Sequence, residues 1–301
     1  MNILITGGTG LVGNALIRSL KNKGHQITVV SRDPQKTLPG ARVISWNLQD
    51  LSSEIDSSNA VINLAGSSLA GKNPLVMRWT KTRKAEIISS RIQAGSILST
   101  ALEKAAHKPE VLIQASAIGY YGNRGEDQVS ENSPPGDDFL ASVCQSWEKS
   151  TSSVEELGIR RIIMRIGLVL SPAGGLLPLL SLPFRFYIGG TIGTGKQIMS
   201  WIHITDLVKS IEYFIENPQT QGIYNITAPK PVTNQEFTAQ LSSTLNRPAW
   251  FSIPSFLLKL TFGEAATLAL DGREVAPNRL LAAGYQFRYN QLSTAVDDLF
   301  K

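Results

Sequence analysis

Cysteine and histidine are scarce in this sequence, which has one cysteine and three histidines among 301 residues. An intramolecular disulfide needs two thiols, so the lone Cys144 predicts a reducing compartment. We therefore expect the cytoplasm or an organelle stroma. Because His25, His107 and His203 are far apart in the chain, no cysteine and histidine cluster has the spacing of metal ligands. We expect no metal site.

Long apolar runs are missing as well. The most apolar later stretches, GGLLPLLSLPF and FLLKLTF, are short and are interrupted by proline or lysine. A helix that crosses a bilayer needs about 20 consecutive apolar residues, so neither stretch could span one. We expect no membrane partner.

Charge of one sign is only mildly in excess, with a net charge of +5. The densest basic stretch, RWTKTRKAEIISSR at 78–91, indicates either a solvated helix face or a face that contacts an anion. No long basic run and no basic stripe with interleaved aromatic residues is present. We expect a small anionic ligand, a small-molecule substrate and no nucleic acid.

The sequence does have ample material for a core, since 42% of it is hydrophobic. Short β-branched runs alternate with amphipathic helical patterns over the first two thirds. Strands that are apolar throughout and separated by helices predict a parallel sheet covered on both faces, which is the α/β doubly wound (Rossmann) fold. We expect strands at Asn2–Ile5, Gln26–Val30, Arg42–Trp46, Ala60–Leu64, Val111–Ala115 and Arg161–Arg165, and helices at Leu11–Lys21, Lys84–Ala106 and Phe139–Glu156.

The pattern changes after residue 171, where glycine and proline become frequent. Such a composition is typical of loops over a ligand cleft, so we expect 171–200 to contribute to the substrate cleft. Residues 1–230 are predicted to form the cofactor-binding domain. Residues 231–301, with two helical patterns and a Tyr/Phe-rich tail, are predicted to form a small C-terminal α/β subdomain.

A glycine triplet lies between the first predicted strand and the first predicted helix, in ILITGGTGLVGNALI. Gly7 allows a tight turn, Gly10 lets backbone N–H groups approach a pyrophosphate, and Gly13 allows close packing of helix on strand. The positive end of the helix then faces the anion. The spacing predicts dinucleotide binding by Gly7, Thr9, Gly10, Leu11, Val12 and Gly13.

The end of the second strand, VVSRD, predicts NADP rather than NAD. A site for NAD usually has an acid there, which binds the ribose 2′-hydroxyl. Here the position is Ser31, followed by Arg32, and a guanidinium can hold a 2′-phosphate in fork geometry. Asp33 is expected to start a turn with Pro34. The alternative is that Arg32 is simply an exposed residue at a strand end.

Together the motifs resemble a known group. TGGTGLVG, NLAG at 63–66, SAIGYYG and GTGKQIMSWIHITD are similar to an extended short-chain dehydrogenase/reductase of the NAD(P)-dependent epimerase/dehydratase type. RW…RK…SR, WE and PFRFYIGG narrow the resemblance to its atypical "epimerase family" branch, which has a C-terminal extension. Some relatives in that branch are labelled cell division inhibitors. The resemblance covers essentially the whole chain.

The resemblance implies further contacts with the cofactor, by Leu64, Ala65, Gly66, Glu86, Arg91 and Val169. The alternatives are a buried strand end at 64–66 and solvated helix charges at Glu86 and Arg91. Related enzymes often dimerise through the helix that contains DDFLASVCQSW. A homodimer through this helix stays open, because the same face could belong to the core.

The same helix departs from the superfamily pattern. A tyrosine that exchanges the substrate proton, and a lysine four residues later that lowers its pKa, are replaced by Phe139 and Val143. At the usual serine position the chain has Ala117, with Ser116 one residue early. Ser116 and Tyr121 are weak candidates for a catalytic role, because their strand end meets the predicted cleft. Packing at the strand end is the alternative.

A second departure concerns the substrate. Nucleotide-sugar enzymes of this class usually carry an arginine where KQIMSWIHITD has Met199, and a thioether cannot pair with a diphosphate. The aromatic residues Trp201, Phe184, Phe186 and Tyr187 suggest an apolar pocket, or else ordinary core. His203 is expected to hold its loop while Asp206 caps the next helix.

Three functions remain after these departures. The first is an NADP(H)-binding oxidoreductase with an atypical mechanism, which acts on a small carbonyl compound. The second is a non-catalytic NADP-binding sensor or adaptor, for example in cell or plastid division. The third, a nucleotide-sugar epimerase, is the least favoured because both the Tyr/Lys pair and the diphosphate arginine are missing.

Overall fold

A parallel sheet of seven strands forms the centre of the molecule. The computed structural model describes residues 1–71, 77–125 and 127–301. The strands run in the order β12-β7-β5-β4-β1-β2-β3, and every neighbouring pair is parallel. Their bounds are β1 Asn2–Thr6, β2 Gln26–Val30, β3 Arg42–Ile44, β4 Ala60–Asn63, β5 Val111–Ala117, β7 Arg160–Ile166 and β12 Gly222–Ile226. The predicted doubly wound fold is confirmed.

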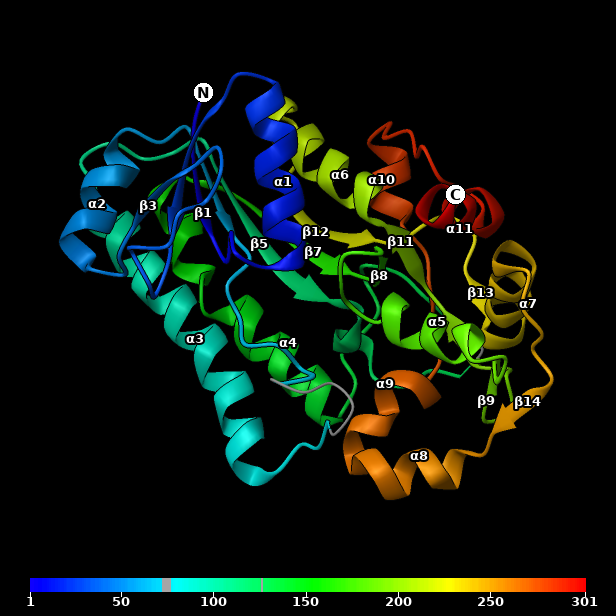
Figure 1. Cartoon of the computed structure of the whole chain (residues 1–301). Helices are drawn as coiled ribbons and strands as arrows, with labels where there is room; N and C mark the ends of the chain where they lie inside the picture. The colour runs from blue at the N-terminus through cyan, green and yellow to red at the C-terminus, as the bar shows by residue number, and fades with distance from the viewer. Residues whose placement is uncertain (72–76, 126) are drawn as a thin grey trace.

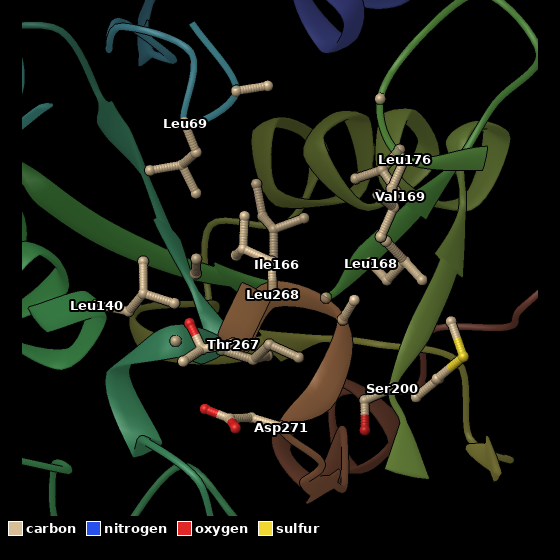
Figure 2. Close-up of a pocket in the computed structure, with 18 of the residues that line it drawn as sticks. Leu69, Leu140, Ile166, Leu168, Val169, Leu176, Ser200, Thr267, Leu268 and Asp271 are labelled. Carbon is tan, nitrogen blue, oxygen red and sulfur yellow. The ribbon is translucent and has the colours of Figure 1, made fainter. Parts of the chain in front are cut away.

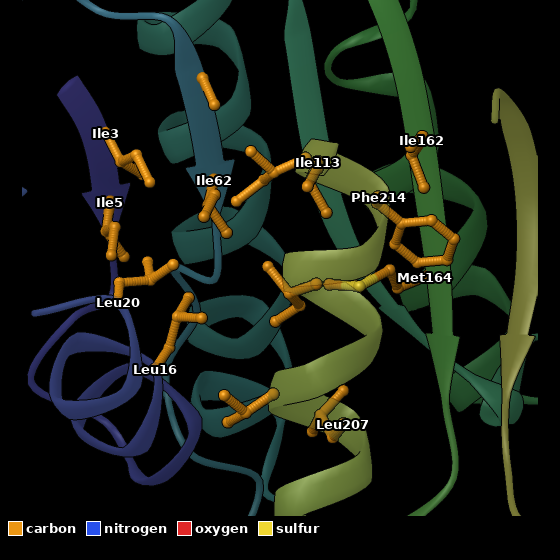
Figure 3. Packing of buried hydrophobic residues seen from close by; sticks show 14 of the residues in the cluster. Ile3, Ile5, Leu16, Leu20, Ile62, Ile113, Ile162, Met164, Leu207 and Phe214 are labelled. Carbon is orange, nitrogen blue, oxygen red and sulfur yellow. The ribbon is translucent and has the colours of Figure 1, made fainter. Parts of the chain in front are cut away.

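Helices cover both faces of the sheet (Figure 1). On one face lie α1 Leu11–Asn22 and α6 Ile204–Glu216, and on the other lie α2 Leu48–Asp56, α3 Lys81–Lys104 and α4 Phe139–Lys149. Successive strand residues point to opposite faces. Ile3 and Ile5 therefore belong to the same cluster as Leu16 of α1 and Phe214 of α6, while Leu4 packs with the helices of the other face. In Figure 3, Leu16 lies on the side of Ile5, and Phe214 lies beside Ile162 and Met164.

Most of the remaining elements gather beyond the carboxyl ends of the sheet strands, whereas the short helix Ser152–Leu157 precedes the amino end of β7 and the helix Asn278–Ala282 packs against β12. The remaining elements are η2 Ile118–Tyr121, β6 Gln128–Val129, η3 Ser152–Leu157, β8 Leu168–Leu170, α5 Leu177–Arg185, β9 Gly190–Ile192, β10 Ile198–Met199, β11 Trp201–His203, β13 Val232–Thr233, α7 Asn234–Leu245, β14 Phe251–Ile253, α8 Ser255–Phe262, η4 Gly263–Ala266, α9 Thr267–Leu270, β15 Glu274–Val275, α10 Asn278–Ala282 and α11 Leu292–Phe300. The two-stranded pairings β13–β10, β14–β9 and β15–β6 join the C-terminal segment to earlier parts of the chain.

The predicted helix Phe139–Glu156 is interrupted. α4 ends at Lys149, and the short 3-10 helix η3 follows. Ser150 Oγ donates to the carbonyl of Trp147 at 2.7 Å, and Ser152 Oγ donates to the carbonyl of Lys149 at 3.0 Å. Hydroxyl groups that bond to nearby carbonyls compete with the helical ladder, which explains the break.

The prediction that Asp206 caps α6 was wrong. The N-cap is His203, whose Nδ1 accepts the amide of Thr205 at 3.1 Å. The Asp206 carboxylate instead accepts the amides of Arg288 and Tyr289 at 2.8 and 2.9 Å. Asp206 therefore fastens the C-terminal segment to α6. Burial lowers the pKa of His203 to about 4, so its ring is neutral near pH 7.

None of the helices within 1–71, 77–125 and 127–301 is both long enough and apolar enough to cross a bilayer.

Candidate functional site

The glycine turn leaves a helix N-terminus open to a ligand. Gly7 has φ +72°, and a Cβ there would lie 2.5 Å from the carbonyl oxygen of Leu64. A Cβ at Gly13 would lie 2.6 Å from the carbonyl oxygen of Gly7, so close packing demands glycine at both positions. α1 begins at Leu11, and no side chain caps it at Gly10. Its first N–H groups and its positive dipole end are therefore available to an anion.

The end of β2 lies beside this turn, because β1 and β2 are neighbours. Ser31 is buried, and its Oγ accepts the amide of Asp33 at 3.1 Å. The Asp33 carboxylate accepts the amide of Gln35 at 3.1 Å, so Asp33 starts a turn, as expected. Arg32 is exposed, and its guanidinium has no hydrogen bond or ion pair to the described residues. It is free to meet a phosphate.

The end of β4 closes the other side of the turn. The side chain of Asn63, which is fully buried, accepts the Thr6 hydroxyl at 2.6 Å and donates to Gln114 at 2.8 Å. Its oxygen also accepts the amide of Ala65 at 3.2 Å. This network fixes the course of 64–66, where Gly66 leaves room for a guanidinium: a Cβ there would lie 3.0 Å from Cζ of Arg91.

The resemblance implied that two charged residues of α3, Glu86 and Arg91, contact the cofactor, and only Arg91 lines the cleft. Arg91 is 8% exposed, lies over the ring of Trp147 at 4.7 Å, and lines the cleft described below. Its Nη1 donates to carbonyls, but its buried Nε has no partner among the residues described. Burial lowers its pKa to about 10. Glu86 is exposed, pairs with Arg83 at 2.5 Å and does not line the cleft.

A cleft of about 700 Å³ opens next to the glycine turn (Figure 2). Its wall is largely aliphatic, with side chains from the turn, the strand ends, α4, α5 and the C-terminal segment. Val169, predicted to meet the cofactor, is among them. Lining residues include Leu11, Val12, Leu69, Leu140, Ile166, Leu168, Val169, Leu176, Leu180, Met199 and Leu268.

The α4 wall of the cleft carries no tyrosine or lysine. Leu140, Val143, Cys144 and Trp147 line the cleft, so two pairs spaced four residues apart face it. Phe139 does not line it; its ring packs against Trp79 with centroids 5.3 Å apart. Burial raises the pKa of Cys144 to about 11, which leaves it an inert thiol near pH 7. Neither of these two pairs, Leu140 with Cys144 and Val143 with Trp147, combines a tyrosine with a lysine.

Neither proposed catalytic candidate lines the cleft. Ser116 is buried and donates to Glu148 at 2.7 Å. Tyr121 is fully buried; its hydroxyl donates to Asn225 at 2.6 Å and accepts from Arg165 at 3.1 Å. Both hydroxyls belong to a polar network beneath the strand ends, and sequence reasoning could not distinguish this position from one in the cleft.

The aromatic residues that suggested an apolar pocket are elsewhere. Trp201 and Phe184 are buried in the core near α7, and Phe186 and Tyr187 are exposed. Aliphatic side chains make the cleft apolar instead.

Sequence reasoning also missed two charged residues of the C-terminal segment, Asp271 and Arg273, which line the cleft. The only local signal is an Asp-Gly turn pair, which says nothing about a site.

Comparisons with protein families and with solved structures show which family this chain belongs to. A family model described as "NAD dependent epimerase/dehydratase family" matches residues 3–227, and one described as "Domain of unknown function (DUF1731)" matches residues 253–299. Epimerase family protein YfhF of Bacillus subtilis (strain 168) is 37% identical over 303 residues, which cover 99% of this chain and 98% of its own. Epimerase family protein SDR39U1 of Mus musculus is 37% identical over 302 residues, 99% of each chain.

A solved structure matches as well. The crystal structure of human epimerase family protein SDR39U1 (isoform2) with NADPH has a TM-score of 0.89 and 35% sequence identity, and the match covers 99% of each chain. The resemblance inferred from the motifs is thereby confirmed. The chain belongs to the NAD dependent epimerase/dehydratase family, and a DUF1731 domain follows at residues 253–299.

Proposed function

We propose that this protein binds NADPH and reduces a small, largely apolar carbonyl compound. The uncapped N-terminus of α1 above the Gly7–Gly13 turn carries the first half of the proposal. It offers backbone N–H groups to the pyrophosphate, and the unpartnered guanidinium of Arg32 offers a fork to the 2′-phosphate. The human relative that was solved with NADPH supports this choice of cofactor.

Arg91 fits the same cofactor. A buried guanidinium with an unpartnered Nε needs an acceptor that the described protein does not supply. Arg91 lines the cleft between the glycine turn and Trp147, where it could meet a phosphate or a ribose oxygen. Leu64, Ala65, Gly66 and Val169 would hold the adenosine and nicotinamide sides. When bound, the reduced nicotinamide supplies a hydride.

The chemistry of the cleft supports the substrate class. An aliphatic wall favours an apolar body, since burying such surface contributes about 25 cal/mol per Å². Met199 lines the cleft where related nucleotide-sugar enzymes are expected to hold a diphosphate with arginine. The site therefore favours a small ketone or aldehyde over a nucleotide sugar.

The second candidate is a non-catalytic NADPH-binding sensor or adaptor. The apolar α4 wall favours it, because general acid–base catalysis contributes roughly 10²–10⁴ in rate and the usual pair for it is absent. Oxidation of NADPH by the purified protein in a panel of hexanal, cyclohexanone and benzaldehyde decides between the two. Turnover above the rate without protein supports the reductase, and no turnover with NADPH bound supports the sensor.

Replacing Arg32 tests the choice of cofactor. We expect Arg32→Ser to weaken NADPH binding at least tenfold and to leave NADH binding unchanged, because only NADPH carries the 2′-phosphate. Fluorescence titration of both nucleotides measures this. The matched control is Lys36→Ser, which removes an exposed cation four residues later in the same loop. Equal affinities for NADPH and NADH in the parent protein would contradict the assignment.

A further inference from the structure

Besides Arg91, the cleft is lined by two charged residues of the C-terminal segment, Asp271 and Arg273. Gly272 packs so tightly that a Cβ there would lie 2.6 Å from the amide nitrogen of Ile198. Next to it, the carbonyl oxygen of Arg273 accepts the hydroxyl of Ser200 at 2.7 Å. These contacts fix the backbone of the Asp271–Arg273 segment against β10. The positions from which the side chains of Asp271 and Arg273 enter the cleft are therefore fixed.

The Arg273 guanidinium is buried without adequate partners. Arg273 is 8% exposed, and its side chain makes one hydrogen bond, from Nη1 to the carbonyl of Ile118 at 3.3 Å. Its buried Nε has no partner among the residues described, although Asp138 and Asp271 lie near enough to favour its charged form. A buried guanidinium is costly unless its donors are satisfied. An oxygen atom of a ligand in the cleft would satisfy them.

Asp271 lines the same cleft, as Figure 2 shows, and its carboxyl group accepts no hydrogen bond from the residues described. Burial raises its pKa, and the nearby Asp138 raises it further, while Arg273 and Lys259 lower it. A carboxyl group in the cleft that accepts no hydrogen bond from the protein and whose pKa is raised is a candidate for exchanging a proton with a bound ligand.

We propose that Arg273 binds the carbonyl oxygen of the substrate and that Asp271 gives that oxygen its proton, in place of the missing tyrosine and lysine. This inference rests on the proposed function. As the carbonyl carbon gains the hydride of the reduced nicotinamide, which is thereby oxidised, the electron pair of the C=O bond moves to oxygen. Arg273 stabilises the developing charge, the oxygen takes the Asp271 proton, and water reprotonates the carboxylate.

The same two residues define the substrate further. The carboxylate of the nearby Asp138 opposes a second negative charge beside Arg273. A carboxylate or diphosphate is therefore disfavoured, and the site fits an uncharged aldehyde or ketone with an aliphatic or aromatic body.

Hexanamide tests the role of Arg273 without any turnover, because its amide carbonyl is not reduced. We expect Arg273→Met to weaken hexanamide binding at least tenfold in calorimetric titrations, run with and without NADP⁺. NADPH affinity should stay within twofold, which shows that the fold is intact. The control is Arg279→Met, which removes an exposed arginine outside the cleft and should change nothing.

A conservative variant covers the case in which Arg273→Met does not fold. Arg273→Lys keeps the charge and loses the fork, so hexanamide binding should still weaken. Unchanged affinity in the folded Arg273 variants, or no saturable hexanamide binding by the parent protein, would overturn the inference. Arg273-dependent hexanamide binding in a protein that reduces no carbonyl would overturn the proposed reaction but keep the oxygen-binding role.

Asp271 is tested by separating binding from turnover. Asp271→Asn should bind hexanamide within about threefold of the parent protein, yet reduce hexanal a hundredfold more slowly or worse, since an amide has no acidic proton to transfer. Asp271→Glu should recover part of the rate. Equal hexanal reduction by the parent protein and Asp271→Asn would remove Asp271 from the mechanism.

Discussion

At the scale of single residues, two groups that line the cleft, the thiol of Cys144 and the carboxyl group of Asp271, differ in how readily they release a proton. Cys144, on the α4 wall, stays a protonated thiol because burial raises its pKa to about 11. Asp271, in the C-terminal segment, is a carboxyl group whose pKa burial also raises. A carboxyl group releases its proton far more readily than a thiol with a pKa near 11, so Asp271 is the better proton donor of the two.

The pH dependence of reduction follows from this shift. The donor is the protonated form of Asp271, so kcat/KM for hexanal should fall as pH rises through its raised pKa. Burial causes most of the rise in the Asp271 pKa, and Asp138 adds to it, whereas Arg273 and Lys259 oppose it. Initial rates from pH 5 to 8 measure the profile. A profile that Asp271→Asn leaves unchanged would assign the step to another group.

Single residues also mark the limit of inference from sequence. The glycine turn could be predicted because three glycines at fixed spacing act locally, next to the strand and helix they join. Asp271 and Arg273 could not, because the pairing of β15 with β6 brings them to the cleft from far along the chain. Tyr121 and Ser116 were misjudged for a related reason: the sequence places them at a strand end but does not show which way they point.

At the scale of elements, α4 is held by its polar contacts to the sheet. Glu148 forms an ion pair with Arg165 of β7, with Nε and Oε1 2.9 Å apart and both side chains buried. Glu148 also accepts the hydroxyl of Ser116 of β5. The exposed positions of α4 are Ser142, Gln145 and Lys149, while its apolar face packs inside the chain. The homodimer through this helix stays a prediction.

Breaking this contact should loosen the helix. Glu148→Gln leaves the buried guanidinium of Arg165 without its counter-charge, so we expect the free energy of unfolding to fall by about 3–5 kcal/mol. Urea denaturation followed by circular dichroism measures it. Glu155→Gln is the control, because Glu155 pairs with Arg161 but its side chain is 59% exposed. The loss of unfolding free energy in this variant should be under about 1 kcal/mol. Equal losses in the two variants would contradict the assigned role.

Helices and strands could be predicted where the local sequence determines them, and were missed where they depend on contacts formed only in the folded chain. The first six strands of the sheet along the chain were predicted within one or two residues at their ends, because strands of a covered parallel sheet are largely apolar. The break after α4 was missed, since it depends on Ser150 and Ser152 hydroxyls that only the folded geometry directs to the chain. The short strands of the C-terminal half were missed as well, because two- and three-residue pairings leave no periodic pattern.

At the scale of the whole molecule, the last part of the chain completes the site that the first part begins. The cofactor turn lies at the head of α1, and the proposed substrate groups lie near β15. Three two-stranded pairings and the Asp206 contacts hold the C-terminal segment in place. Binding of NADPH at the turn should therefore stabilise the molecule as a unit.

Calorimetric titration of the purified protein with NADPH tests the central claim most directly. We predict saturable binding with one site per chain and a melting temperature that rises with NADPH concentration, as mass action requires for a ligand of the folded state. Gly7→Ala should abolish both effects, because its Cβ would collide with the carbonyl of Leu64. No heat and no rise in melting temperature with millimolar NADPH would contradict the account.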